Sequence, residues 1–150
     1  SKASKRMFVI FHLIKSGVQL ADIVVVYCSI ISSILEYACP VWHCGLSKAQ
    51  ADDIESVQRR CMRALLPDIS YDEALVIFGL ERLDVRRERI VRDLFNEVKC
   101  EGHVLNHLLL KRNTELSKVD IRNKYPYLMK FGKTNRLNRS FIHYCIKKKY

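Results

Sequence analysis

The stretch Leu35-Glu36-Tyr37-Ala38-Cys39-Pro40-Val41-Trp42-His43 joins two apolar helical patterns. The pattern before it runs from about residue 20 to residue 38 and stops there, because the residue preceding Pro40 is pushed out of the helical region. The pattern after it opens at Ser47, a residue type that caps helix N-termini. We expect this junction to lie at the centre of a packed core, with three of its side chains as core residues: Tyr37, Cys39 and Trp42.

The segments on either side of the junction repeat their apolar residues at spacings of three and four, which predicts helices. Residues 2–15 form one such segment, and Gly17 is expected to end it as a left-handed residue after the helix. Ser70 and Glu73 have the spacing of a capping box at the start of a short helix. Asp84 is expected to cap a longer helix that follows. No useful run alternates with period two, so the sequence predicts an all-α fold, a small helical bundle.

Three segments are expected along the chain. Residues 1–66 form the helical bundle, residues 67–110 add further helices packed on it, and residues 111–150 form a basic, partly irregular C-terminal extension. The chain starts at Ser1 without an initiator methionine, so we expect it to be an internal or truncated piece of a longer protein.

The net charge of +10 is confined to the end of the chain. Residues 1–110 hold 14 Lys and Arg against 14 Asp and Glu, whereas residues 111–150 hold 12 against 2. A neutral body with a basic end indicates a polyanionic partner. A solvated tail is the alternative that charge alone leaves open.

The six cysteines lack the dense, glycine-rich spacing of secreted disulfide scaffolds, and some of them lie on apolar helix faces. We therefore expect reduced thiols and an intracellular protein, nuclear or cytoplasmic. The longest uncharged apolar run, from Ile23 to Leu35, would be about 20 Å long as a helix, short of the roughly 30 Å hydrocarbon layer. It predicts a buried core helix and no membrane partner.

No arrangement in the sequence supports catalysis by this chain alone. The pair Asp52-Asp53 lies in the first turns of a helix, where acids complement the helix dipole. The junction residues Cys39, His43 and Cys44 supply three soft ligands in one stretch, fewer than the four of a structural zinc site. We expect no metal, no cofactor and no small-molecule substrate here.

The arginines and lysines suggest contact with nucleic acid, because guanidinium groups match phosphate oxygens in pairs. Aromatic residues are interleaved with the C-terminal ones and could either stack on unpaired bases or anchor the segment to the body. The candidate nucleic-acid-binding residues are Arg59, Arg60, Arg63, Arg136, Arg139, Lys147, Lys148 and Lys149.

Taken in order, several motifs resemble the C-terminal region of reverse transcriptases from non-LTR (LINE-type) retrotransposons. They are Gly17-Val18, Tyr27-Cys28, residues 35–43, Lys48-Ala49-Gln50, Ile54-Glu55-Ser56-Val57-Gln58, Tyr71-Asp72-Glu73-Ala74-Leu75, Gly79-Leu80-Glu81, Thr134-Asn135-Arg136 and Asn138-Arg139-Ser140-Phe141-Ile142. The resemblance covers nearly the whole chain and implies a thumb-like bundle followed by a post-thumb extension. It implies RNA template and DNA primer or target as partners, with the catalytic aspartates and their Mg outside this chain.

Residues 5–46 also look like a short N-terminal domain described for an AlkB-homologue tRNA-modifying protein. The His-x-Asp…His iron triad of dioxygenases is missing from the sequence, and so is a glycine loop for a methyl-donor cofactor. The alternative function is therefore an all-α protein-interaction module without activity of its own.

Overall fold

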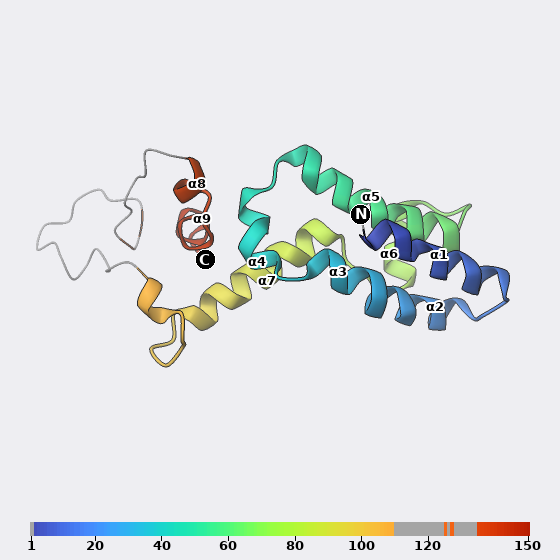
Figure 1. Cartoon of the computed structure of the whole chain (residues 1–150), viewed down its shortest axis with the longest axis horizontal. Coiled ribbons are helices and arrows are strands. Elements are labelled where there is room, and N and C mark those ends of the chain that lie inside the picture. The colour runs from blue at the N-terminus through green and yellow to red at the C-terminus, as the bar shows by residue number, and fades with distance from the viewer. Residues whose placement is uncertain (1, 110–124, 126, 128–134) are drawn as a thin grey trace, which may run out of the picture. The chain divides into compact units, whose positions relative to one another are not determined.

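The computed structural model describes residues 2–109, 125, 127 and 135–150. Their regular structure is helical without a strand, which confirms the all-α prediction (Figure 1). The α-helices are α1 (Lys2–Lys15), α2 (Leu20–Tyr27), α3 (Ser33–Glu36), α4 (Cys39–Trp42), α5 (Lys48–Leu65), α6 (Tyr71–Ile77), α7 (Leu83–Val98), α8 (Asn135–Asn138) and α9 (Phe141–Lys148). Three short helices of other types are η1 (Cys28–Ser32), η2 (His43–Gly45) and η3 (Asn106–Leu108).

The chain divides into two compact units. The first unit comprises Ser1–Ala38 and Ser47–Arg87, and the second comprises Cys39–Leu46 and Glu88–Tyr150. Helix α7 therefore supplies its first residues to one unit and the rest to the other. This division does not coincide with the boundaries expected at residues 66 and 110.

Helix α1 ends as its sequence predicts. Gly17 has a φ of +73°, in the left-handed region that glycine adopts without a steric penalty. The Gly17 amide donates to the Ile14 carbonyl at 3.1 Å, and the Val18 amide donates to the Leu13 carbonyl at 3.3 Å. These bonds satisfy carbonyls that the end of the helix would otherwise leave without donors.

One apolar face runs along α2, η1 and α3. Its residues Ile23, Tyr27, Ile31 and Leu35 are spaced by four and are all buried. In a straight α-helix each step of four advances the side chain about 40° around the axis, so the face would drift. The π-turn of η1 bonds each residue to the fifth rather than the fourth before it, and the wider turn rotates the face back.

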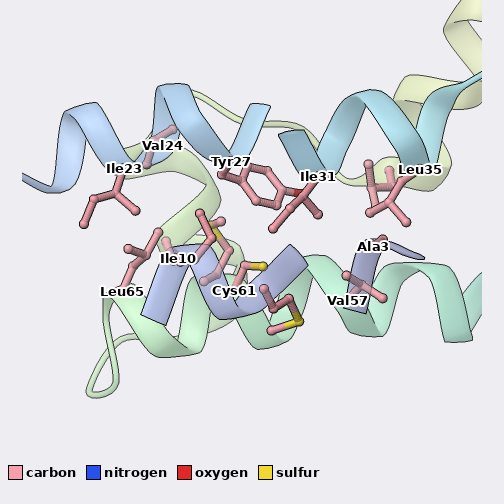
Figure 2. Close-up of a cluster of buried hydrophobic side chains, with 14 of the residues drawn as sticks. Ala3, Ile10, Ile23, Val24, Tyr27, Ile31, Leu35, Val57, Cys61 and Leu65 are labelled. Atoms are coloured by element: carbon pink, nitrogen blue, oxygen red, sulfur yellow. The ribbon is translucent and has the colours of Figure 1, made fainter. Parts of the chain in front are cut away.

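The core of the first unit lies between this face and two other helices. Figure 2 shows Ile23, Tyr27 and Ile31 pointing toward Ile10 of α1 and Cys61 of α5. Ala3 and Val57 close the core near Leu35, and Leu65 lies near Ile23. The apolar residues of α5 thus face inward at the three- and four-residue spacing read from the sequence.

The predicted cap at Ser47 and the predicted capping box at Ser70 are confirmed, and Ser47 also forms a capping box, which was not predicted. The Ser47 hydroxyl accepts from the Gln50 amide at 3.2 Å, and the Gln50 side chain accepts from the Ser47 amide at 2.9 Å. Ser70 and Glu73 form the same reciprocal pair at the start of α6. Asp84 does not cap α7 as predicted, because the helix begins one residue earlier, at Leu83.

The junction differs from its predicted place at the centre of one core. Tyr37 is 79% exposed, so the prediction that it is a core residue is wrong. The reason is the backbone: Ala38 has a φ of +50°, a left-handed conformation that ends the helix after α3 and turns the chain. Beyond this turn Cys39 is buried and Trp42 is half-buried, and both belong to the second unit.

The second unit has its own core, which recruits the C-terminal segment. Val91 and Phe95 of α7 pack in a cluster with Cys44, Tyr127, Cys145 and Ile146. Helices α8 and α9 were not foreseen in a segment read as irregular. The described residues after 124 therefore help to form this core and are more than an extension; residues 110–124 lie outside the described residues.

One helical stretch, Leu20–Gly45, is long and apolar enough to cross a membrane by length and composition, with a mean hydropathy of 1.7. About a third of its most apolar window (33%) is buried within the protein. Core helices of soluble proteins pass the same test, and the inward face of α2, η1 and α3 accounts for the buried part.

Replacing Ile31 by alanine should destabilise the first unit by about 2–5 kcal/mol, because the side chain is fully buried and its removal leaves a cavity. The matched control is Val25→Ala on the same helical run, whose side chain is exposed and whose loss should cost less than about 0.5 kcal/mol. Chemical denaturation followed by circular dichroism measures both. Equal effects of the two substitutions would contradict this packing.

Candidate nucleic-acid interface

The three arginines of α5 lie on its exposed side. Arg59, Arg60 and Arg63 occupy the last two turns of the helix, opposite the buried residues Cys61 and Leu65. Among the described residues none of the three forms an ion pair with an acid. Their guanidinium groups lie on the surface of the helix, and their contact with nucleic acid stays a prediction.

A ring on α6 supports the first of these arginines. The Arg59 guanidinium lies over the Tyr71 ring, 5.3 Å from its centroid, at a distance typical of a cation–π contact. The Tyr71 hydroxyl donates to the Glu55 carboxylate at 2.5 Å, which fixes the ring. Burial, together with this bond to a carboxylate, raises the pKa of Tyr71 well above its usual value.

Buried polar groups behind the arginines hold α5 in place. Glu55 is 3% exposed, and the same carboxylate oxygen accepts from the Leu83 amide at 3.3 Å. Gln58 accepts from the Tyr27 hydroxyl at 2.8 Å and donates to the Glu81 carbonyl at 2.9 Å. The motif residues Glu55 and Gln58 thus join four parts of the first unit, and this bracing is a structural role.

Helix α1 adds a basic surface that the sequence reading missed. Between residues 1 and 21 the sequence contains no acid, and the exposed positions of α1 include Lys2, Lys5 and Lys15. Phe8, 71% exposed, stacks on His12 with ring centroids 6.0 Å apart. The sequence analysis considered only the apolar residues of this segment, although the lysines between them indicate an outer face.

The predicted basic residues of the second unit are exposed, but some have partners within the unit. Arg136, Arg139 and Lys149 lie on the surface. Lys147 donates to the Asn138 carbonyl at 3.3 Å, and Lys148 lies 3.3 Å from the Glu88 carboxylate. The two lysines at the end of α9 also complement the negative end of the helix dipole, so part of this charge has a structural use.

The aromatic residues of the C-terminal segment act as anchors where they are described. Tyr127 is buried, and Phe141 packs edge-on against Phe95 with centroids 6.1 Å apart. Tyr144 is half-buried and donates its hydroxyl to Glu88. These contacts support the anchoring role among the two that the sequence left open; Phe131 lies outside the described residues.

Glu88 is the acceptor around which the second unit closes. Its carboxylate accepts from the hydroxyls of Tyr144, at 2.7 Å, and Tyr150. His43 Nε2 lies 2.7 Å from it. Burial alone would raise the pKa of Glu88, but the hydrogen bonds of His43 and Tyr144 and the charge of Lys148 outweigh it and lower the pKa below its usual value.

Metal binding and thiol chemistry gain no support from the described part of the chain. It contains no group of three or more ligand side chains that could hold a metal ion. All six cysteines are free thiols. Burial raises the pKa of Cys44 to about 11 and that of Cys145 to about 12, which keeps both thiols protonated near neutral pH. Asp52 and Asp53 are exposed on α5.

Comparison of the chain with protein-family models, with curated proteins and with solved structures gave no match in any of the three.

Glu88→Gln should destabilise the second unit by about 1–3 kcal/mol at neutral pH, because the half-buried hydroxyls of Tyr144 and Tyr150 lose a charged acceptor. The folded-state pKa of Glu88 is lowered, so its contribution is present above the unfolded pKa and lost as pH falls through the folded one. The variant should therefore be less sensitive to acid than the parent.

Denaturant unfolding at neutral pH and near pH 4 tests this expectation. Glu97→Gln on the same helix is the matched control, since that side chain is exposed. If the free energy of unfolding falls equally in the parent and in Glu88→Gln between the two pH values, the Glu88 carboxylate is not the acid-sensitive group.

Proposed function

We propose that the chain is a non-catalytic C-terminal piece of a non-LTR retrotransposon RNA-directed DNA polymerase. It holds template and primer through basic helix surfaces, while the chemistry takes place elsewhere in the parent protein. The observation that carries the proposal is the set of three exposed arginines on α5, none of which forms an ion pair with an acid of the described residues.

Exposed arginines are common, so their setting matters. Phosphate recognition needs donors that keep their positions, and arginine loses less rotamer freedom when its plane is supported. Arg59 is supported by the Tyr71 ring, and α5 is capped at Ser47 and braced internally by Glu55 and Gln58. A rigid helix that presents guanidinium groups suits backbone contact with a duplex, which positions nucleic acid without reading its sequence.

Two further surfaces add positive charge to this role. Helix α1 carries lysines and the exposed Phe8, whose ring face suits an unpaired base. In the second unit, Arg136, Arg139 and Lys149 are candidates for a single strand. Such a role belongs inside the cell, where the six thiols would stay reduced.

The arginine pair Arg60→Gln/Arg63→Gln should weaken binding to an RNA–DNA hybrid and flatten its salt dependence. Each phosphate contact contributes about 0.9 to the slope of log affinity against log salt, so losing two should reduce the slope by about 1.8. Both side chains are exposed, so the variant should unfold like the parent. Fluorescence anisotropy across a salt series measures the slope.

The control removes the same charge from α7 through Arg89→Gln/Arg92→Gln; Arg92 lies 3.7 Å from Asp93 and has an acidic partner already. It should change the slope much less. The proposal would be contradicted if the α5 variant bound the hybrid as tightly as the parent does, or if the affinity of the parent did not change with salt concentration. Either result would favour the alternative, a protein-interaction module. Deleting residues 111–150 is not a usable test, because it would remove Cys145 and Ile146 from the core of the second unit.

A further inference from the structure

An open apolar hollow lies on the outer side of α6, within the first unit. It has a volume of about 570 Å³ and is lined by Ile69, Asp72, Glu73, Val76 and Ile77. Val76 is 80% exposed, Ile77 58% and Ile69 37%. Three aliphatic side chains thus meet in one exposed place, which is more than the scattered single apolar residues of an ordinary surface.

The fold of the first unit does not require these side chains. Helix α6 already buries Ala74 and Leu75 in the core. Val76 and Ile77 lie one turn after Asp72 and Glu73, so the outer face of this short helix carries two acids followed by two aliphatic residues. Polar residues at positions 76 and 77 would serve the core equally well.

The charge at the hollow is opposite to that of the chain as a whole. Asp72 and Glu73 line it, and Asp68 precedes Ile69 in the sequence. Glu73 also holds the Ser70 amide and hydroxyl, and Asp72 lies 3.7 Å from Arg82, with both side chains largely exposed. Two of the five lining residues are therefore acids and none is a cation, although Arg82 pairs with Asp72.

We propose that this hollow docks a short segment of a partner protein in which a bulky aliphatic or aromatic side chain is flanked by lysines or arginines. The apolar side chain would enter between Val76 and Ile77 as an anchor. Its basic neighbours would lie beside Asp72 and Glu73, which favours the encounter and fixes the register. The acids repel phosphate, which excludes nucleic acid as the occupant. The inference is independent of the arginines of α5.

A display library of short random peptides, selected on the full chain, tests the proposal. Peptides that also bind the double variant Val76→Lys/Ile77→Lys are removed from the library by counter-selection on that variant. The remaining peptides should share a bulky apolar residue next to Lys or Arg. Their affinity, measured by fluorescence anisotropy, should fall about tenfold or more in the double variant and less in Asp72→Asn.

Val104→Lys is the matched control, because Val104 is equally exposed and lies in the second unit. It should leave peptide affinity unchanged. Asp72→Asn keeps the test valid if the lysine variant fails to fold. The proposal is overturned if no peptide depends on Val76 and Ile77, if the enriched peptides are acidic, or if Val104→Lys weakens them equally. Self-association of the parent that Val76→Lys/Ile77→Lys abolishes would identify a second copy as the occupant and overturn it too.

Discussion

The arrangement of the first unit depends on the hydrogen bonds that one buried carboxylate accepts. Glu55 lies on the core side of α5, where removing a carboxylate from water costs several kcal/mol unless donors replace the lost hydration. Two donors bond to its Oε1 atom: the Tyr71 hydroxyl at the start of α6 and the Leu83 amide at the start of α7. Its Oε2 atom is buried without a hydrogen-bond partner among the described residues. Because both donors belong to helix starts, the carboxylate fixes where two helices begin relative to a third.

The second unit follows the same principle with other residues. Glu88 gathers Tyr144 and Tyr150 from the C-terminal segment and His43 from the junction, so three segments far apart in the sequence meet at one acceptor. Hydrogen bonds to a charged group contribute more than those between neutral groups. Each unit thus combines a modest apolar core with an acid and its tyrosine donors, an arrangement that specifies positions as well as stability.

The features that the sequence predicted correctly are the local ones. The cap at Ser47, the capping box at Ser70 and the helix end at Gly17 depend on residues within one turn of each other. The missed features depend on distant partners. Tyr37 leaves the core because Ala38 adopts a left-handed backbone that its residue type does not announce, and α9 forms where Cys145 and Ile146 meet Phe95 of α7.

The candidate interface divides in the same way. The exposed side of α5 follows from its periodicity, so the three arginines could be placed from the sequence. The support of Arg59 by Tyr71 needs a contact between two helices, and no pattern within α5 encodes it. Helix α1 contains many apolar residues, so its exposed face could not be predicted from their number. Phe8, for example, stacks on His12 at the surface and does not enter the core.

The position of Trp42 gives the molecule a built-in optical reporter. It is the only tryptophan in the sequence, it is half-buried, and it belongs to the second unit. Indole emission therefore follows solvent access in that unit alone, whereas far-ultraviolet dichroism sums helices from both. Unfolding curves that coincide for the two signals would mean that the units unfold as one cooperative block, and curves that separate would resolve two transitions.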